Sequence, residues 1–218
     1  IMPPYADGQA TSHAYLNRNK QSVALDLKQP ACIEQVKQLI GQYDILVEQF
    51  RPNVMARLGL GYDDLKAINP KLIYCSITGY GQTSDYKDRA GHDINYLALA
   101  GIAGHSGRQD GGPPPLGIQV ADVAGGSLHA VIGILAAVIE RQVSGQGQHI
   151  DISMTDCAFT LNSMAASAQV AGGEDQTAEG GMLNGASFYD YYQTQDGRYL
   201  SIGSLEPQFM LGLATALQ

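Results

Sequence analysis

The stretch Leu72–Ile77, with the sequence LIYCSI, decides the fold class because it is a short apolar run rich in β-formers. Two further apolar runs precede it, Asp44–Glu48 (DILVE) and Val23–Leu27 (VALDL), and each is typical of a strand. Between these two runs, a helix is predicted from Pro30 to Tyr43, with proline in its first turn and apolar residues at helical spacing. This alternation predicts βαβ units around a mostly parallel sheet.

The same alternation continues along the chain to about residue 170. Short helices are predicted at Val54–Leu58 and Tyr62–Ile68, and a long one from Gly125 to Gln142. A strand at Ile150–Ile152 is followed by an alanine-rich helix from Thr155 to Val170. Residues 1–170 are therefore expected to form one large α/β domain, a mostly parallel Rossmann-like sheet with helices on both faces.

Beyond residue 170 the composition changes. Residues 171–182 are rich in glycine and are predicted to be a linker. Two aromatic-rich strands follow, Phe188–Tyr192 and Tyr199–Ile202, and the Asp196-Gly197 pair between them is a strong hairpin signal. Residues 183–218 are expected to be the start of a smaller second α+β domain. Because both chain ends look cut, we expect the sequence to be a fragment.

Composition restricts the class of protein. Of the 218 residues, 44% are hydrophobic and 16% charged, which is typical of a soluble globular protein. The net charge of −8 argues against a nucleic-acid partner. No uncharged apolar run reaches about 18 residues, so no membrane span is expected, and no signal peptide is predicted. The three cysteines lack metal-site spacing, which indicates free thiols, a cytoplasmic location and no metal.

Two residues stand out as candidate proton carriers. His92 lies in the run RAGHDINY beside Asp93, and Asp122 lies between an apolar run and Gly125-Gly126, just ahead of the long predicted helix. Histidine and aspartate at such junctions can take a hydrogen from carbon and return it. The alternative is structural, namely a core histidine and a helix N-cap aspartate, since aspartate is a preferred N-cap residue.

The loop Gly79–Thr83 follows the strand Leu72–Ile77, at the sheet edge where open α/β proteins bind ligands. It carries neither of the glycine-rich fingerprints of nucleotide-binding proteins. His92 follows this loop and is therefore expected to lie where a site is built.

Several motifs together resemble the α-methylacyl-CoA racemases, within the larger class III CoA-transferase (CaiB/BaiF-like) family. The resemblance extends from about Asn17 to Phe209, and the 30-residue separation of His92 and Asp122 also fits it. The motifs that carry it are GHDINYLALAG (91–101), EQFRP (48–52), RLGLG (57–61), GYGQT (79–83) and LEPQF (205–209).

The resemblance implies racemisation at C2 of 2-methyl-branched acyl-CoA thioesters through a planar enolate. His92 and Asp122 would each handle the proton on one face, while Asp93 and Glu206 would orient or polarise the His92 side. The N-terminus of the helix after Asp122 could donate hydrogen bonds to the enolate. The resemblance to the family also implies an interlocked homodimer.

Coenzyme A would enter only as part of the acyl-CoA substrate, and no prosthetic group is expected. The resemblance places Lys28, Arg51 and Arg57 at its anionic groups and Tyr96 near the pantetheine or acyl end. For each basic residue the alternative is a solvated surface charge.

The sequence also departs from the family pattern. Asn53 stands where glycine is usual, although asparagine also accepts left-handed geometry. Ser84-Asp85 replaces a Gly-Pro pair and adds a negative charge near the expected site. The first strand–helix unit of the family is not found before Ile1.

Two other functions stay open. A class III CoA-transferase would use Asp122 as a nucleophile, and its reaction does not need His92. The Gly-His-Asp context favours the racemase, as does the presence of only Gly180-Gly181 where transferases often carry a longer glycine run. The other alternative is a non-catalytic CoA-binding remnant.

Overall fold

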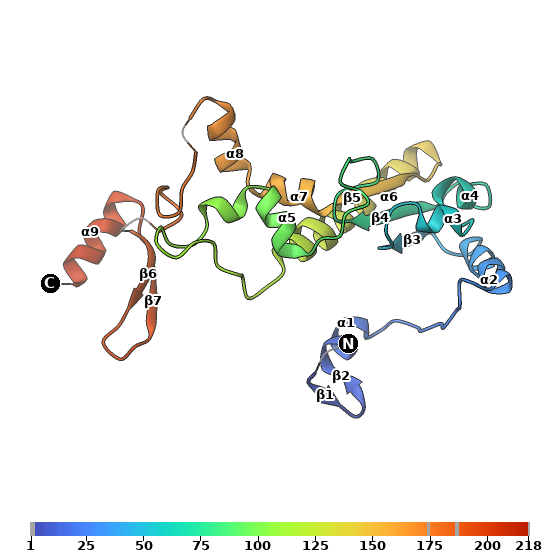
Figure 1. Cartoon of the computed structure of the whole chain (residues 1–218), viewed down its shortest axis with the longest axis horizontal. Helices are drawn as coiled ribbons and strands as arrows, with labels where there is room; N and C mark the ends of the chain where they lie inside the picture. Colours follow the sequence, from blue (N-terminus) through green and yellow to red (C-terminus); the bar gives the residue numbers. More distant parts are fainter. Residues whose placement is uncertain (1–2, 174, 186–187, 218) are drawn as a thin grey trace.

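The computed structural model describes residues 3–173, 175–185 and 188–217, and Figure 1 shows the chain as an elongated molecule. In chain order the elements are β1 (Tyr5–Ala6), β2 (Gln9–Ala10), α1 (Thr11–Asn17), α2 (Pro30–Ile40), β3 (Ile45–Glu48), α3 (Val54–Arg57), α4 (Tyr62–Lys66), β4 (Ile73–Thr78), α5 (Asp93–Leu99), the 3₁₀-helix η1 (Ile102–His105), the π-helix η2 (Ala121–Leu128), α6 (His129–Ser144), β5 (His149–Ser153), α7 (Met154–Leu161), α8 (Ser163–Val170), β6 (Tyr189–Gln193), β7 (Tyr199–Gly203) and α9 (Pro207–Ala216).

The centre of the molecule is a parallel sheet in the order β3-β4-β5. In its register Val47 pairs with Cys75, and Cys75 pairs with Ile150. The middle strand, β4, is almost wholly buried because helices cover it on both sides. The predicted parallel α/β fold is thus confirmed.

Side chains that alternate along β4 enter two different cores. Tyr74 packs with Ile40 of α2 and Leu65 of α4 on one face. On the opposite face Cys75 packs with Ala130 of α6 and with the β5 residue Ile152. The two-residue period of a strand produces this division, and it confirms the prediction of helices on both faces.

The predicted strand Val23–Leu27 is wrong. This segment is extended but belongs to no sheet, and Val23 is 67% exposed. A strand exists only where a neighbour completes its hydrogen bonds, and no described strand lies beside the free edge of β3. Figure 1 shows the segment as a long connection that leads away to β1, β2 and α1.

The long helix begins earlier than predicted. It starts at Ala121 with the eight-residue π-helix η2 and continues as α6 to Ser144. Glycines allow the π turn to approach α7 closely, because a Cβ on Gly125 would lie 3.0 Å from the carbonyl oxygen of Met154. The predicted helix Thr155–Val170 is also interrupted, with α7 and α8 separated at Asn162.

The combined helix Ala121–Ser144 spans 24 residues, and its most apolar stretch has a mean hydropathy of 1.8. By length and composition alone it could cross a membrane, as could many core helices of soluble proteins. It is tied to the segments that lead into β3 and β4, since Arg141 donates to the carbonyl oxygen of Lys71 at 3.0 Å and contacts the Asp44 carboxylate at 3.1 Å. The absence of a membrane span stays a prediction.

The C-terminal part contains the predicted hairpin. Strands β6 and β7 pair antiparallel, with Tyr192 opposite Leu200, around the Asp196-Gly197 turn. In Figure 1 this hairpin and α9 lie at the end of the molecule away from β3. Arg108 ties the hairpin to the loop after η1 through a two-pronged contact with Asp190, at 2.6 and 2.8 Å. The predicted division into residues 1–170, 171–182 and 183–218 stays a prediction.

Asn53 adopts the left-handed conformation that the sequence analysis allowed for it. Its φ of 64° and ψ of 0° place it in the αL region directly before α3. Glycine is the residue with no steric cost in that region, and asparagine is the usual substitute. The departure from the family's glycine therefore leaves the turn after β3 intact.

Candidate active site

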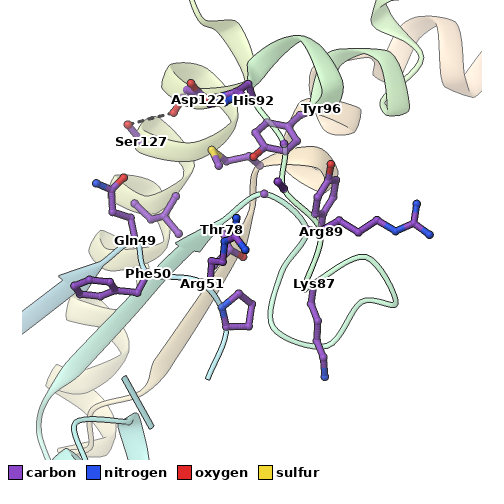
Figure 2. A pocket seen from close by; sticks show the side chains of 17 residues that line it. Gln49, Phe50, Arg51, Thr78, Lys87, Arg89, His92, Tyr96, Asp122 and Ser127 are labelled. Atoms are coloured by element: carbon purple, nitrogen blue, oxygen red, sulfur yellow. Dashed lines mark hydrogen bonds between the residues drawn. The ribbon is translucent and has the colours of Figure 1, made fainter. Parts of the chain in front are cut away.

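A cavity of about 450 Å³ opens at the carboxyl ends of β3 and β4. This is the sheet edge at which the sequence analysis expected a site. Figure 2 shows the side chains that surround it. They come from the turn after β3, the end of β4, the loop before α5, the helices α5 and η2, and the first residue of α7. The lining residues are Gln49, Phe50, Arg51, Pro52, Ile77, Thr78, Gly79, Tyr80, Lys87, Arg89, Ala90, Gly91, His92, Tyr96, Asp122, Ser127 and Met154.

His92 and Asp122 lie together in the wall of this cavity (Figure 2). His92 is exposed and precedes the first turn of α5, where its backbone N–H donates to the side-chain oxygen of Asn95 at 3.0 Å. Asp122 is half-buried inside η2, whose N-cap is Val120. Both structural alternatives are therefore wrong, since the histidine is not in the core and the aspartate is not a helix cap.

Asp93 supports Asp122 and makes no hydrogen bond to the His92 ring. Its buried carboxylate accepts a hydrogen bond from the backbone N–H of Asp122 at 3.0 Å. This contact joins the start of α5 to the start of η2, and so fixes the two proton-carrier candidates relative to each other. The expectation that Asp93 orients the His92 side is replaced by a role in holding the Asp122 backbone.

Burial raises the pKa of Asp122 above its ordinary value. The negative charge of Asp93 raises it further, while the nearby His92 partly opposes the rise. Both causes of the increase act by disfavouring the charged form of the carboxyl group. The shift moves Asp122 towards neutral pH, where a carboxyl group can both take and return a proton.

The start of η2 was expected to donate hydrogen bonds to an enolate. However, the backbone N–H groups of Asp122 and Val123 already donate to partners within the protein. The N–H of Asp122 donates to Asp93, and that of Val123 donates to the carbonyl oxygen of Gln119 at 3.0 Å. A substrate oxygen at this point would have to find its donors elsewhere in the cavity wall.

Tyr96 is buried against Tyr80, with the two ring centroids 5.3 Å apart in an edge-to-face arrangement. Two glycines make room for the rings. A Cβ on Gly79 would lie 2.6 Å from the Tyr96 hydroxyl oxygen, and one on Gly91 would lie 2.6 Å from ring atom Cε1 of Tyr96. The two glycines are thus required by close packing, and Tyr96 lines the cavity as the sequence analysis expected.

The three predicted CoA-binding cations do not all lie at the cavity. Arg51 lines the cavity, whereas Lys28 and Arg57 do not. Lys28 is exposed in the turn before α2, and Arg57 is exposed in the last turn of α3. Two cations that the sequence analysis missed, Lys87 and Arg89, contribute to the cavity lining. Their position shortly after the Gly79–Thr83 loop was the only signal that could have found them.

Glu206 does not line the cavity. It is the N-cap of α9, which Figure 1 places well apart from α5 and β4. Of the four predicted catalytic residues, the structure brings together His92, Asp93 and Asp122, and it leaves Glu206 outside this group.

The altered loop pair Ser84-Asp85 is accommodated by a local turn. The Ser84 side-chain oxygen accepts a hydrogen bond from the backbone N–H of Tyr86 at 2.9 Å. Asp85 is exposed and is not part of the cavity lining. The added negative charge therefore lies outside the cavity.

Within the described residues, no group of three or more His, Cys, Asp or Glu side chains is arranged to hold a metal ion. All three cysteines are free thiols; Cys75 is buried and the other two are half-buried. The cavity offers instead an imidazole, a carboxyl group of raised pKa and three cationic side chains.

Comparison with known proteins identifies the family of this chain. The sequence matches CoA-transferase family III over residues 1–218. The chain belongs to this family. It is 42% identical over 202 residues to the alpha-methylacyl-CoA racemase of Mus musculus, and 42% identical over 160 residues to the succinate–glutarate CoA-transferase of Agrobacterium fabrum. These alignments cover 92% and 71% of this chain.

A solved CaiB/BaiF family protein from Brucella suis is similar over 97% of this chain, with a TM-score of 0.83 and 32% identity. The family III member described here spans only part of its relatives, namely 53% of the mouse racemase, 40% of the bacterial transferase and 56% of the Brucella chain. Its relatives include both racemases and transferases, so membership of the family does not decide between these two reactions, and the reaction is argued from the site.

Proposed function

We propose that this protein racemises 2-methyl-branched acyl-CoA thioesters at C2. The observation that carries the proposal is the joint presence of His92 and Asp122 in the wall of one cavity, with the pKa of Asp122 raised by burial. A racemase needs two proton carriers, one for each face of the reacting carbon, and these two residues are suited to that task.

The proposed reaction is a transfer of protons with no net change in composition. The thioester makes the hydrogen on C2 acidic, and one residue removes it to leave a planar enolate. The other residue then delivers its own proton to the opposite face of C2. The enzyme finishes with the proton on the first residue and none on the second, so the next turnover runs in the reverse direction or follows exchange with solvent.

The environment of Asp122 supports this role. An ordinary aspartate is too weak a base to remove a hydrogen from carbon efficiently at neutral pH, because general bases work best with a pKa near the working pH. Burial and the neighbouring Asp93 charge both raise the Asp122 pKa in the required direction. Histidine is the residue most often used for proton transfer in enzymes, and His92 supplies an imidazole to the same cavity.

The cations of the cavity support an acyl-CoA substrate. Coenzyme A carries phosphate groups, and Arg51, Lys87 and Arg89 contribute to the same cavity as the proton carriers. Arginine is suited to two-pronged phosphate contacts. We assign the anionic part of the substrate to this group of cations, in place of the set Lys28, Arg51 and Arg57.

We also propose that the protein acts as a homodimer in the cytoplasm, without a prosthetic group. An apolar stripe on α6 supports an assembly, since Ile132, Leu135, Ile139 and Val143 are each more than half exposed. These residues recur at three- to four-residue spacing and so share one face of the helix. The dimer would be checked by measuring the molar mass of the full-length protein in solution.

A class III CoA-transferase is the second candidate, and the 42% identity to the Agrobacterium transferase favours it. In that reaction the Asp122 carboxylate attacks the thioester carbonyl, and the CoA thiolate leaves to give a mixed anhydride. His92 takes no part in these steps. The dependence on His92 therefore separates the two reactions.

The deciding experiment follows deuterium incorporation at C2 by NMR, using the full-length reading frame and a 2-methylacyl-CoA in deuterated water. The racemase predicts deuterium at C2 and loss of optical purity without any acceptor acid. In that case His92→Ala lowers the exchange rate by about 10²- to 10⁴-fold. No exchange, together with CoA transfer to an added carboxylic acid that survives His92→Ala, would establish the transferase. Binding of CoA with neither reaction would identify a non-catalytic remnant.

A further inference from the structure

The backbone around Asp122 is held by an unusual set of side-chain contacts. Asp122 lies in the π-helix η2, and the turn continues directly into α6 at His129. In an α-helix each carbonyl accepts from the N–H four residues later, whereas in a π-helix the partner is five residues later. Single π turns within longer helices are frequent at functional sites.

Two side chains contact η2 carbonyls at this same five-residue spacing. The Ser127 hydroxyl donates to the carbonyl oxygen of Asp122 at 3.3 Å. The imidazole Nδ1 of His129 lies 2.6 Å from the carbonyl oxygen of Ala124. Because a carbonyl oxygen can only accept, this short contact requires the proton to be on Nδ1.

The other ring nitrogen of His129 joins η2 to the neighbouring helix. Its Nε2 lies 3.2 Å from the hydroxyl oxygen of Thr160 in α7, and that hydroxyl is also 2.7 Å from the carbonyl oxygen of Cys157. The half-buried imidazole therefore links the carbonyl of Ala124 to a fixed point on α7. The backbone of Asp122 is thus held at two points, because its N–H donates to Asp93 and its carbonyl oxygen accepts from Ser127. The His129 contact holds the same helix two residues later, at the carbonyl oxygen of Ala124.

We propose that His129 is a positioning residue, which keeps η2 in the π-helical register and so keeps the Asp122 carboxyl group in the cavity. Relaxation of η2 to an α-helix would remove one residue from the turn. Since one residue corresponds to about 100° of rotation around an α-helix, the side chains before the turn would swing around the helix axis. Asp122 would then point away from the cavity.

This inference rests on the proposed function only in that Asp122 must act in the reaction. A racemase uses Asp122 as a proton carrier and a transferase uses it as a nucleophile, so the position of its carboxyl group matters to both. Substrate binding depends instead on the cavity cations, which His129 does not contact. Loss of the Nδ1 donor should therefore lower kcat and leave KM little changed.

The test compares four variants of the full-length protein. His129→Leu removes the donor, and His129→Asn restores an amide donor at nearly the same position. Thr160→Val removes the contact to Nε2 and the hydroxyl's bond to the Cys157 carbonyl, and it leaves the Nδ1 contact in place. His105→Leu is the matched control, because His105 is a half-buried histidine whose Nε2 contacts the side-chain oxygen of Asn162 at 2.9 Å, outside η2.

We expect His129→Leu to lower kcat by about 10- to 100-fold, in keeping with the cost of misplacing a reacting group by about 1 Å. KM should change by less than about threefold, and His129→Asn should recover most of kcat. Thr160→Val should have a smaller effect, and His105→Leu should leave kcat within about twofold. A His129→Leu protein with unchanged kcat, or a loss that His129→Asn does not recover, would overturn the proposal.

Two readouts separate this inference from the proposed function. If the wild-type protein transfers CoA and does not exchange the C2 proton, the racemase fails, and the same variants are compared in the transfer reaction. If it does neither, amide hydrogen exchange of residues 121–128 decides. The proposal then expects faster exchange in His129→Leu than in the wild type or His129→Asn, and equal exchange in all three would refute it.

Discussion

Replacing Gly91 with alanine gives the sharpest test of the packing beneath the cavity. The new Cβ would lie 2.6 Å from both the Tyr80 hydroxyl oxygen and Cε1 of Tyr96, which is 0.8 Å inside the 3.4 Å at which ordinary contact begins. Both rings are buried, so neither can turn aside into solvent. The φ of Gly91 is not in the left-handed region, and the cost is therefore steric alone.

Overpacking of this kind lowers the free energy of unfolding by about 1–3 kcal/mol. The displaced Tyr96 ring also lines the cavity, and a shift of about 1 Å there can lower the reaction rate by up to about 100-fold. Chemical denaturation measures the first effect, and C2 proton exchange or CoA transfer measures the second. Tyr96 follows His92 by one turn of α5, so a shift of its ring also alters the part of the cavity wall that contains His92.

Gly104→Ala is the matched control, because a Cβ there meets no atom within 4 Å and its φ is also outside the left-handed region. That variant should be as stable as the wild type or up to about 1 kcal/mol more stable. Wild-type stability and rate in Gly91→Ala would refute the conclusion that Tyr80 and Tyr96 are fixed beneath the cavity.

Substitutions at three further positions test local contacts and backbone geometry. Asp93→Asn keeps an acceptor for the Asp122 N–H but removes a negative charge beside it, so the pKa of Asp122 should fall. The acidic limb of the pH–rate profile should therefore move to lower pH, and a limb that stays in place or moves to higher pH contradicts this. Asn53→Val should lower the free energy of unfolding by about 1–2 kcal/mol and Asn53→Gly should change it by less than about 1, whereas equal values would contradict the left-handed φ. Arg108→Lys loses the two-pronged contact with Asp190, so amide exchange in β6 and β7 should become faster while β4 stays protected; unchanged exchange in the hairpin would show that the contact is not its anchor.

The strands of the central sheet could be predicted from the sequence because their signal is local. The runs Asp44–Glu48, Leu72–Ile77 and Ile150–Ile152 each differ from the observed strand by at most one residue at either end. A strand such as β4, which is buried on both faces, needs apolar side chains at consecutive positions, and such a run is visible without any knowledge of its neighbours. Val23–Leu27 has the same local signal and fails, because no described strand is available to pair with it.

Two of the cavity cations could not be predicted from the sequence, because they carry no local signal. Lys87 and Arg89 stand in a loop of mixed charge, and nothing in their own sequence distinguishes them from solvated surface residues. They contribute to the cavity only because the loop returns to the carboxyl end of β4 before α5 begins. Lys28, by contrast, is a CoA-binding residue that the resemblance implied, yet it lies in an exposed turn outside the cavity. The resemblance to the family predicted cations at a CoA site, and the path of the chain determines which cations line the cavity.

The place of Asp122 follows from the topology of the sheet. Strand β5 pairs parallel with β4, so α6, which leads into β5, must run back from the carboxyl edge of the sheet to its amino edge. The start of that helix unit therefore lies at the carboxyl edge, where α5 also begins. A strand–helix–strand pattern thus predicts that His92 and Asp122 lie near the same edge. It does not predict which side chain of the first helical turn faces the cavity, because that choice depends on the π register of η2 and on the distant contacts with Asp93 and α7.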